Sequence, residues 1–147
     1  MSADPGALVG RVLGGRYVLD RHLGRGAMGD VYRAHHVKVP RAFAVKILRP
    51  ELVKDPKVVS RFEREAQLAG RLQHRNVTSV IDVGVADGTH YLVMDFADGS
   101  DLGTVMAGEP MESVRAIALF GQIVDGLAHA HAHEVAVSYT HLRSPRD

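Results

Sequence analysis

The chain has 147 residues, of which 46% are apolar and 24% charged, a composition typical of one modest globular domain. Its 18 basic and 17 acidic side chains leave a formal charge of +1, so no basic excess supports nucleic-acid binding. The absence of cysteine excludes disulfides, thiolate zinc sites and cysteine nucleophiles. No secretory leader pattern or membrane-spanning apolar run is present, which predicts a cytoplasmic protein and leaves room for a membrane anchor outside this chain.

The N-terminal half is predicted to contain strands followed by one helix. Residues 1–15 are expected to form a flexible lead. The β-forming segments that follow predict three strands, over residues 16–23, 31–36 and 42–48. Asp55 suits a helix N-cap and Pro56 the first helical position, so a helix is expected to begin here and end near His74.

The remaining segments predict two more strands and then helices. The strands cover residues 79–85 and 90–96, with an Asp87-Gly88 turn between them. A short helix is expected over residues 102–106 and a longer one over residues 111–133, with apolar residues such as Ile117 and Phe120 on one stripe. Helices do not alternate with every strand, which favours a mainly antiparallel sheet over a doubly wound parallel one.

A glycine-rich stretch separates the first two predicted strands. Gly24, Gly26, Gly29 and Val31 have the form G-x-G-x-x-G-x-V, which lets backbone N–H groups approach a phosphate chain without obstruction by Cβ atoms. A plain tight turn or a dinucleotide-binding unit gives a similar pattern. The dinucleotide alternative needs a following helix and an acidic residue about 20 positions on. Here a strand follows, and Lys46 occupies that place.

Two charged residues stand in otherwise apolar surroundings. Lys46 lies inside an apolar strand, where a simple explanation is an edge lysine that reaches water. Glu65 lies in the apolar stripe of the predicted helix, where an unpaired buried carboxylate is costly. A loosely packed helix that leaves Glu65 hydrated is the alternative. An ion pair between Lys46 and Glu65 accounts for both residues, and it would lie beneath the glycine-rich loop.

In this order, the glycine-rich loop, Ala44-Val45-Lys46 and Arg64-Glu65-Ala66 resemble the small lobe of a protein kinase, most closely that of bacterial Ser/Thr kinases of the eukaryotic type. The resemblance extends from about Tyr17 to His133. It implies an α+β fold with a five-stranded antiparallel sheet and a regulatory helix over residues 16–97. The first helices of a truncated helical large lobe follow over residues 98–134.

The resemblance also implies that the chain binds ATP. The glycine-rich loop would cover the phosphates, while Leu23, Val31 and Ala44 would line the adenine pocket. The full set of implied ATP contacts is Leu23, Gly24, Arg25, Gly26, Ala27, Met28, Gly29, Asp30, Val31, Ala44, Lys46, Met94, Asp95 and Ala97.

Individual roles follow from the same resemblance. Lys46 would hold the α- and β-phosphates and would be kept in place by Glu65. Met94 would be the gatekeeper, and the backbone of Asp95 and Ala97 would bond the edge of the adenine. The complete kinase would use Mg²⁺ and transfer phosphate to protein substrates.

Two features outside this set have other interpretations. Asp101 occupies a place where a polar residue often lies on the ribose side. His129, His131 and His133 have the spacing H-x-H-x-H, and a metal-binding helix is an alternative function for them, although no carboxylate or cysteine completes such a site.

The family pattern ends before the catalytic loop. Ser138 and Tyr139 stand where the arginine and aspartate of a His-Arg-Asp motif would fall, and residues 145–147 come too late to replace it. We therefore assign no catalytic base and no metal ligand. The segment 135–147 is interpreted as foreign sequence at the end of a fragmentary gene, or else as part of a naturally short, pseudokinase-like module that binds nucleotide without phosphorylating.

Overall fold

The computed structural model describes residues 4–133, which form two compact units. The first combines the chain up to Gly70 with Thr78–Ala97, and the second combines Arg71–Val77 with the chain from Asp98 onward. The segment 135–147 that departs from the family pattern lies outside the described residues. None of the helices in the described part of the chain has the length and apolar character needed to cross a lipid bilayer.

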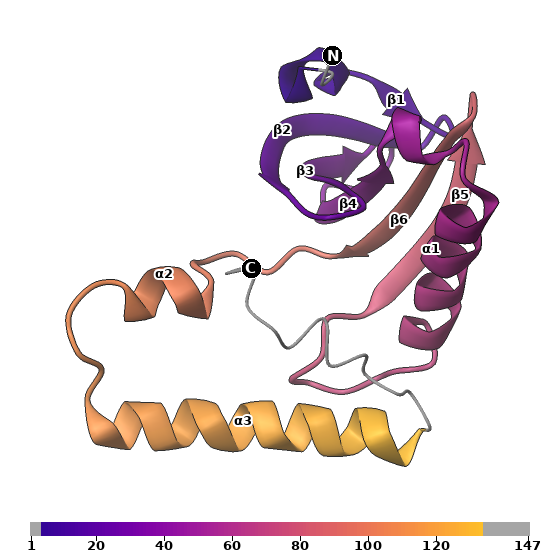
Figure 1. The fold of residues 1–147 in the computed structure, drawn as a ribbon. Helices are drawn as coiled ribbons and strands as arrows, with labels where there is room; N and C mark the ends of the chain where they lie inside the picture. Colours follow the sequence, from indigo (N-terminus) through magenta and orange to yellow (C-terminus); the bar gives the residue numbers. More distant parts are fainter. Residues whose placement is uncertain (1–3, 134–147) are drawn as a thin grey trace. The chain divides into compact units, whose positions relative to one another are not determined.

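An antiparallel sheet forms the body of the first unit, as predicted (Figure 1). Its strand order is β1-β2-β3-β4-β6-β5. The strands are β1 (Val12–Leu13), β2 (Tyr17–Arg25), β3 (Gly29–His36), β4 (Ala42–Leu48), β5 (Val80–Ala86) and β6 (Thr89–Asp95). The turn between β5 and β6 has positive φ at Asp87 (50°) and Gly88 (73°), which confirms the predicted Asp-Gly turn.

The sheet has six strands rather than the predicted five. The additional strand lies within residues 1–15, which were expected to be a flexible lead and which also contain a short helix. The 3₁₀ helix η1 (Pro5–Leu8) begins where Asp4 accepts a hydrogen bond from the Gly6 N–H at 3.0 Å. Strand β1 then pairs with β2, and Leu13 is fully buried. Burial of one leucine and the pairing of two residues depend on tertiary contacts, so local sequence patterns do not reveal them.

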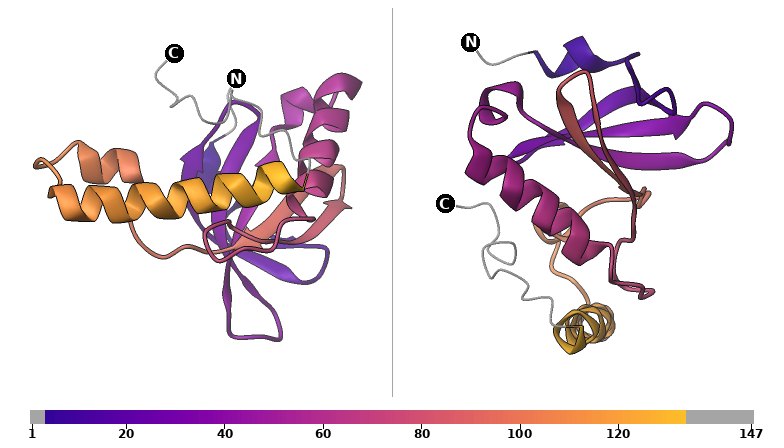
Figure 2. Two further views of the ribbon diagram at one scale, coloured as in Figure 1. Left: turned by 90° about the horizontal axis from the view of Figure 1, so that it is seen from below. Right: turned by 90° about the vertical axis from the view of Figure 1, so that its right-hand side faces the viewer.

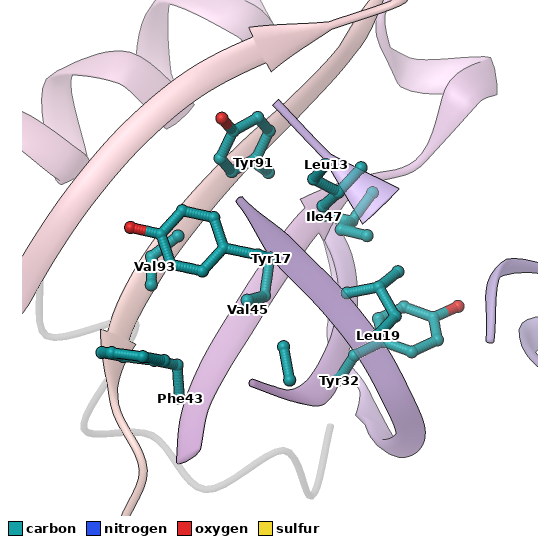
Figure 3. Close-up of a cluster of buried hydrophobic side chains, with 10 residues drawn as sticks. Leu13, Tyr17, Leu19, Tyr32, Phe43, Val45, Ile47, Tyr91 and Val93 are labelled. Carbon is teal, nitrogen blue, oxygen red and sulfur yellow. The ribbon is translucent and has the colours of Figure 1, made fainter. Parts of the chain in front are cut away.

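One face of the sheet carries an aromatic core (Figure 3). Tyr17 packs edge-to-face against Phe43 and Tyr91, with ring centroids 5.7 and 6.4 Å away. Its hydroxyl donates to Asp82 at 3.0 Å, so the polar end of this buried ring has a partner. The buried residues of this core are Leu13, Tyr17, Leu19, Tyr32, Ala34, Phe43, Val45, Ile47, Tyr91 and Val93.

The opposite face of the sheet packs against the helix α1 (Pro56–Ala69), as Figure 2 shows in its right-hand view. The predicted N-cap is confirmed, since Asp55 accepts a hydrogen bond from the Lys57 N–H at 2.9 Å. Phe62 of α1 is buried in a second cluster. The helix ends at Ala69 rather than near His74, because Gly70 caps it. The apolar Leu72 continued the helical pattern in the sequence beyond this cap.

The second unit contains α2 (Leu102–Met106), α3 (Ser113–Ala132) and the segment Arg71–Val77. The buried residues of α3 are Gly126 and Ala130. A Cβ atom on Gly126 would lie only 3.0 Å from the Asn76 carbonyl oxygen, so this glycine permits close packing. The predicted apolar stripe is exposed at its N-terminal end within the described residues, where Ile117 is 72% and Phe120 66% accessible.

Three histidine rings lie together in this second unit. The His129 ring centroid is 4.9 Å from that of His74 and 4.2 Å from that of His133. His133 Nδ1 donates to the His129 carbonyl at 2.9 Å, and the Asn76 N–H donates to His74 Nδ1 at 3.1 Å. Among residues 4–133, no group of three or more His, Asp or Glu side chains is arranged to hold a metal ion.

The stacked histidines predict a pH-dependent stability of the second unit. Burial, followed by the neighbouring His133 and His74, lowers the pKa of His129. The unfolded chain therefore takes up this proton more readily than the folded chain, and stability falls as the pH drops below about 6.5. Thermal unfolding between about pH 7.5 and pH 5.5 should be less pH-dependent in His129→Gln than in the wild type. The exposed His131→Gln is the control, and equal pH dependence in all three proteins would contradict the prediction.

Candidate nucleotide-binding site

The strand register brings the sequence-predicted site residues into one row across the sheet. Gly24 pairs with Val31, Val31 with Lys46, and Lys46 with Leu92. Directly opposed residues of antiparallel strands place their side chains on the same face. Gly24 and Lys46 are 22 positions apart in the sequence, but in the sheet only strand β3 lies between them.

The face that carries Lys46 is the face that α1 covers. Leu48 and Leu92 belong to the same buried cluster as Phe62 of α1, and Lys46 lies two positions from Leu48 on β4. Glu65 follows Phe62 by one helical turn and, like Lys46, is half-buried. The structure thus places the lysine and the helix of the glutamate on one face of the sheet. The ion pair between Lys46 and Glu65 stays a prediction.

The residues predicted to line the adenine pocket differ in solvent exposure. Ala44 is buried, and it pairs across strands with Met94, which packs against the second cluster. Leu23 is 41% accessible in this unit. Asp95 ends β6, where its carboxylate is paired with the guanidinium of Arg41. The hinge contact that the resemblance implies for Asp95 uses its backbone, and the Asp95 N–H already donates to the Ser79 carbonyl at 3.0 Å. The contacts of Asp95 and Ala97 with adenine stay predictions.

The turn of the glycine-rich hairpin is shorter than the predicted bend. Strand β2 continues to Arg25 and β3 begins at Gly29, where the Gly29 carbonyl accepts a hydrogen bond from the Gly26 N–H at 2.8 Å. Arg49, just after β4, holds this turn. Its backbone N–H donates to the Met28 carbonyl at 3.2 Å, and its guanidinium donates to the Ala27 carbonyl.

The three loop glycines differ in what a Cβ atom at each position would meet. A Cβ atom on Gly29 would lie 2.1 Å from the Ile47 carbonyl oxygen, so the pairing of β3 with β4 demands glycine there. A Cβ on Gly24 would meet nothing within 4 Å, and one on Gly26 would meet only the Gly29 carbonyl at 3.5 Å. The protein fold thus leaves open space beside Gly24. Such space suits a ligand that approaches the backbone closely, as a phosphate chain does.

An ion cluster closes the base of the same hairpin. Asp30 is buried, and its Oδ1 accepts hydrogen bonds from Arg25 Nε at 2.8 Å and His22 Nε2 at 3.2 Å. Arg25 also bonds Oδ2 at 3.3 Å. The bond from Arg25 is the largest influence on the pKa of Asp30 and lowers it, His22 lowers it further, and burial opposes both. The carboxylate is therefore charged at neutral pH.

The pairing of Arg25 with Asp30 is not among the sequence-based expectations, which list both residues as ATP contacts. Their positions on either side of the predicted turn are the signal that indicates the pair. Neither His22 nor Arg49 stands in a pattern that points to the hairpin. Asp101, placed near the ribose from sequence, is the N-cap of α2 and accepts hydrogen bonds from the Thr104 N–H at 2.8 Å and hydroxyl at 2.7 Å.

Comparisons with known proteins agree with this architecture. The profile of the protein kinase domain matches residues 17–141. The serine/threonine-protein kinase PrkC of Bacillus subtilis is 37% identical over 129 residues, which are 87% of this chain and 20% of PrkC. PknH of Mycobacterium tuberculosis, also a serine/threonine-protein kinase, is 43% identical over 122 residues, which are 82% of this chain and 20% of PknH.

Solved structures give the same result. The PknI kinase domain of Mycobacterium tuberculosis superposes with a TM-score of 0.71 at 32% identity, covering 86% of this chain and 52% of that one. The chain therefore belongs to the protein kinase family, and its relatives are bacterial Ser/Thr kinases. It spans about a fifth of the length of the curated relatives it matches.

The contrast between Gly29 and Gly24 can be tested by substitution with alanine. Gly29→Ala should lower the free energy of unfolding by about 1–3 kcal/mol, because the strands must move apart to admit the methyl group. Gly24→Ala should leave stability nearly unchanged, since its methyl group would enter open space. Chemical denaturation of the two variants measures the difference. Equal destabilisation by both would contradict the close approach of Gly29 to β4.

Proposed function

We propose that this chain is the ATP-binding part of a Ser/Thr protein kinase whose complete form transfers the γ-phosphoryl group of Mg-ATP to serine and threonine hydroxyls of proteins. The observation that carries the proposal is the row in which Gly24, Val31 and Lys46 lie on adjacent strands. It places an unobstructed backbone turn and a cation on the helix-covered face of the sheet. Membership of the family and the names of its relatives support the same activity.

The residues of this face suit the parts of ATP. The glycine-rich turn offers backbone N–H groups to the phosphates, and Lys46 supplies a positive charge to the α- and β-phosphates. Val31, Ala44 and Met94 present apolar surface to the adenine ring. Mg²⁺ bound with ATP would neutralise phosphate charge, and none of the residues proposed here is a ligand for it.

We further propose that the chain as given binds ATP without transferring phosphate. The support is in the sequence, where Ser138 and Tyr139 replace the arginine and the catalytic aspartate expected after α3. These positions lie outside the described residues. A nucleotide-binding module of the pseudokinase type is the second candidate function, and the same replacement supports it.

Nucleotide binding can be measured by titrating the chain with a fluorescent ATP analogue and displacing it with ATP. Lys46→Met should weaken ATP binding about ten- to a hundredfold, because it removes a charge-assisted bond to phosphate. Lys38→Met, which changes an exposed lysine in the connection between β3 and β4, is the matched control and should bind like the wild type. Equal affinity of the Lys46 and Lys38 variants would contradict the assigned site.

Phosphotransfer is tested separately with ATP labelled in its γ-phosphate and a generic protein substrate. The chain should incorporate no more label than Lys46→Met does, because Tyr139 stands where the resemblance places the catalytic aspartate. Steady incorporation above that background would show that the chain is an active kinase. ATP binding without incorporation is the combined result expected.

A further inference from the structure

The buried carboxylate of Asp30 lies on the face of the sheet opposite to Lys46. Asp30, Tyr32 and Ala34 alternate along β3, and the latter two belong to the aromatic core. Val31, between them, faces the other way and pairs with Lys46. A ligand on the Lys46 face therefore meets Val31, while the side chain of Asp30 is directed toward the opposite side of the hairpin.

The partners of Asp30 come from the strand on the other side of the turn. Arg25 is its cross-strand neighbour, and only residues 26–28 lie between β2 and β3. The His22 ring packs edge-on against Tyr32, at a centroid distance of 5.2 Å, and Tyr32 is 1% exposed. The ion cluster thus connects the base of the phosphate-binding turn to the rigid core beneath it.

We infer that Arg25, Asp30 and His22 are positioning residues that fix the glycine-rich turn for phosphate binding, rather than residues that contact ATP. The inference rests on the proposed function and revises the ATP contacts that the family resemblance assigns to Arg25 and Asp30. The Arg25 guanidinium holds that carboxylate through Nε and one terminal nitrogen. The pair is neutral overall, so the carboxylate does not repel an approaching phosphate chain.

Arg49 completes the fixation from the other end of the turn. It binds the carbonyl groups of Ala27 and Met28. Because the C=O and N–H groups of one trans peptide plane point in opposite directions, the Met28 N–H is turned away from Arg49. The turn is therefore held at its base by the Asp30 cluster and at its tip by Arg49, and its N–H groups are oriented before a ligand arrives. Such preorganisation increases affinity because less conformational entropy is lost on binding.

The test compares the affinities for ATP and for adenosine, which lacks phosphates. The variants are Arg25→Gln, Asp30→Asn and the double variant, with Arg21→Gln as a control that removes a neighbouring exposed arginine. Each single variant should weaken ATP binding about tenfold while adenosine affinity stays within about twofold. The double variant should bind ATP with an affinity no lower than that of the more impaired single variant, because both substitutions break the same bond. Arg25→Lys, which keeps the charge, should recover part of the affinity.

Other results would overturn the inference. If Arg25→Gln weakens ATP binding but Asp30→Asn does not, Arg25 contacts phosphate directly. If these variants lose affinity for ATP and for adenosine to the same extent, the cluster of Arg25, Asp30 and His22 stabilises the fold and does not position the turn for phosphate. If Asp30→Asn fails to fold, His22→Gln takes its place, because it removes the other donor to Asp30 and leaves Arg25 intact. ATP affinity of His22→Gln equal to that of the wild type would then contradict the inference. Failure of the proposed function gives a different result, in which the wild-type chain does not bind ATP or Lys46→Met binds it equally well.

Discussion

The pairing of β3 with β4 is the constraint on which the rest of the structure depends. These strands align from Gly29 opposite Leu48 to His35 opposite Ala42, and at Gly29 the two backbones are too close for any side chain. This register sets Lys46 beside Val31 and decides which residues of β4 face the helix. A shift by one residue would turn Lys46 into the aromatic core, where an unpaired charge is strongly unfavourable.

The two faces of the sheet have different roles: one contributes the main core and the other carries the proposed ligand site. One face buries an aromatic core whose polar ends are bonded, as in the bond from Tyr17 to Asp82. The other face packs against α1 through Phe62 and leaves Lys46 half-buried beside the glycine-rich hairpin. Because Asp30 and Val31 are adjacent on β3, the same strand holds the ion cluster on one side and the proposed ligand surface on the other. This alternation explains how a charged hairpin is kept rigid without presenting a carboxylate to phosphate.

Much of this architecture could be predicted from the sequence because its signals are local. The apolar run over residues 42–48, the Asp55 cap and the Asp-Gly turn all predicted the elements that form. The spacing of glycines and Lys46 indicated the kind of site. The strand β1, the end of α1 and the contacts of Arg49 were not predictable, because each depends on tertiary packing or on backbone carbonyls that no residue pattern records.

We propose that the strand register sets Lys46 beside the phosphates of bound ATP. An acyl phosphate of ATP tests it directly, because the amine nearest its phosphate chain attacks the acyl carbon, forms an amide and releases the nucleotide. The chain has four lysines, and mass spectrometry of its peptides can locate the acyl group on Lys38, Lys46, Lys54 or Lys57. We expect Lys46 to be labelled first and excess ATP to prevent its labelling. Labelling spread over all four lysines and unaffected by ATP would contradict this position of Lys46.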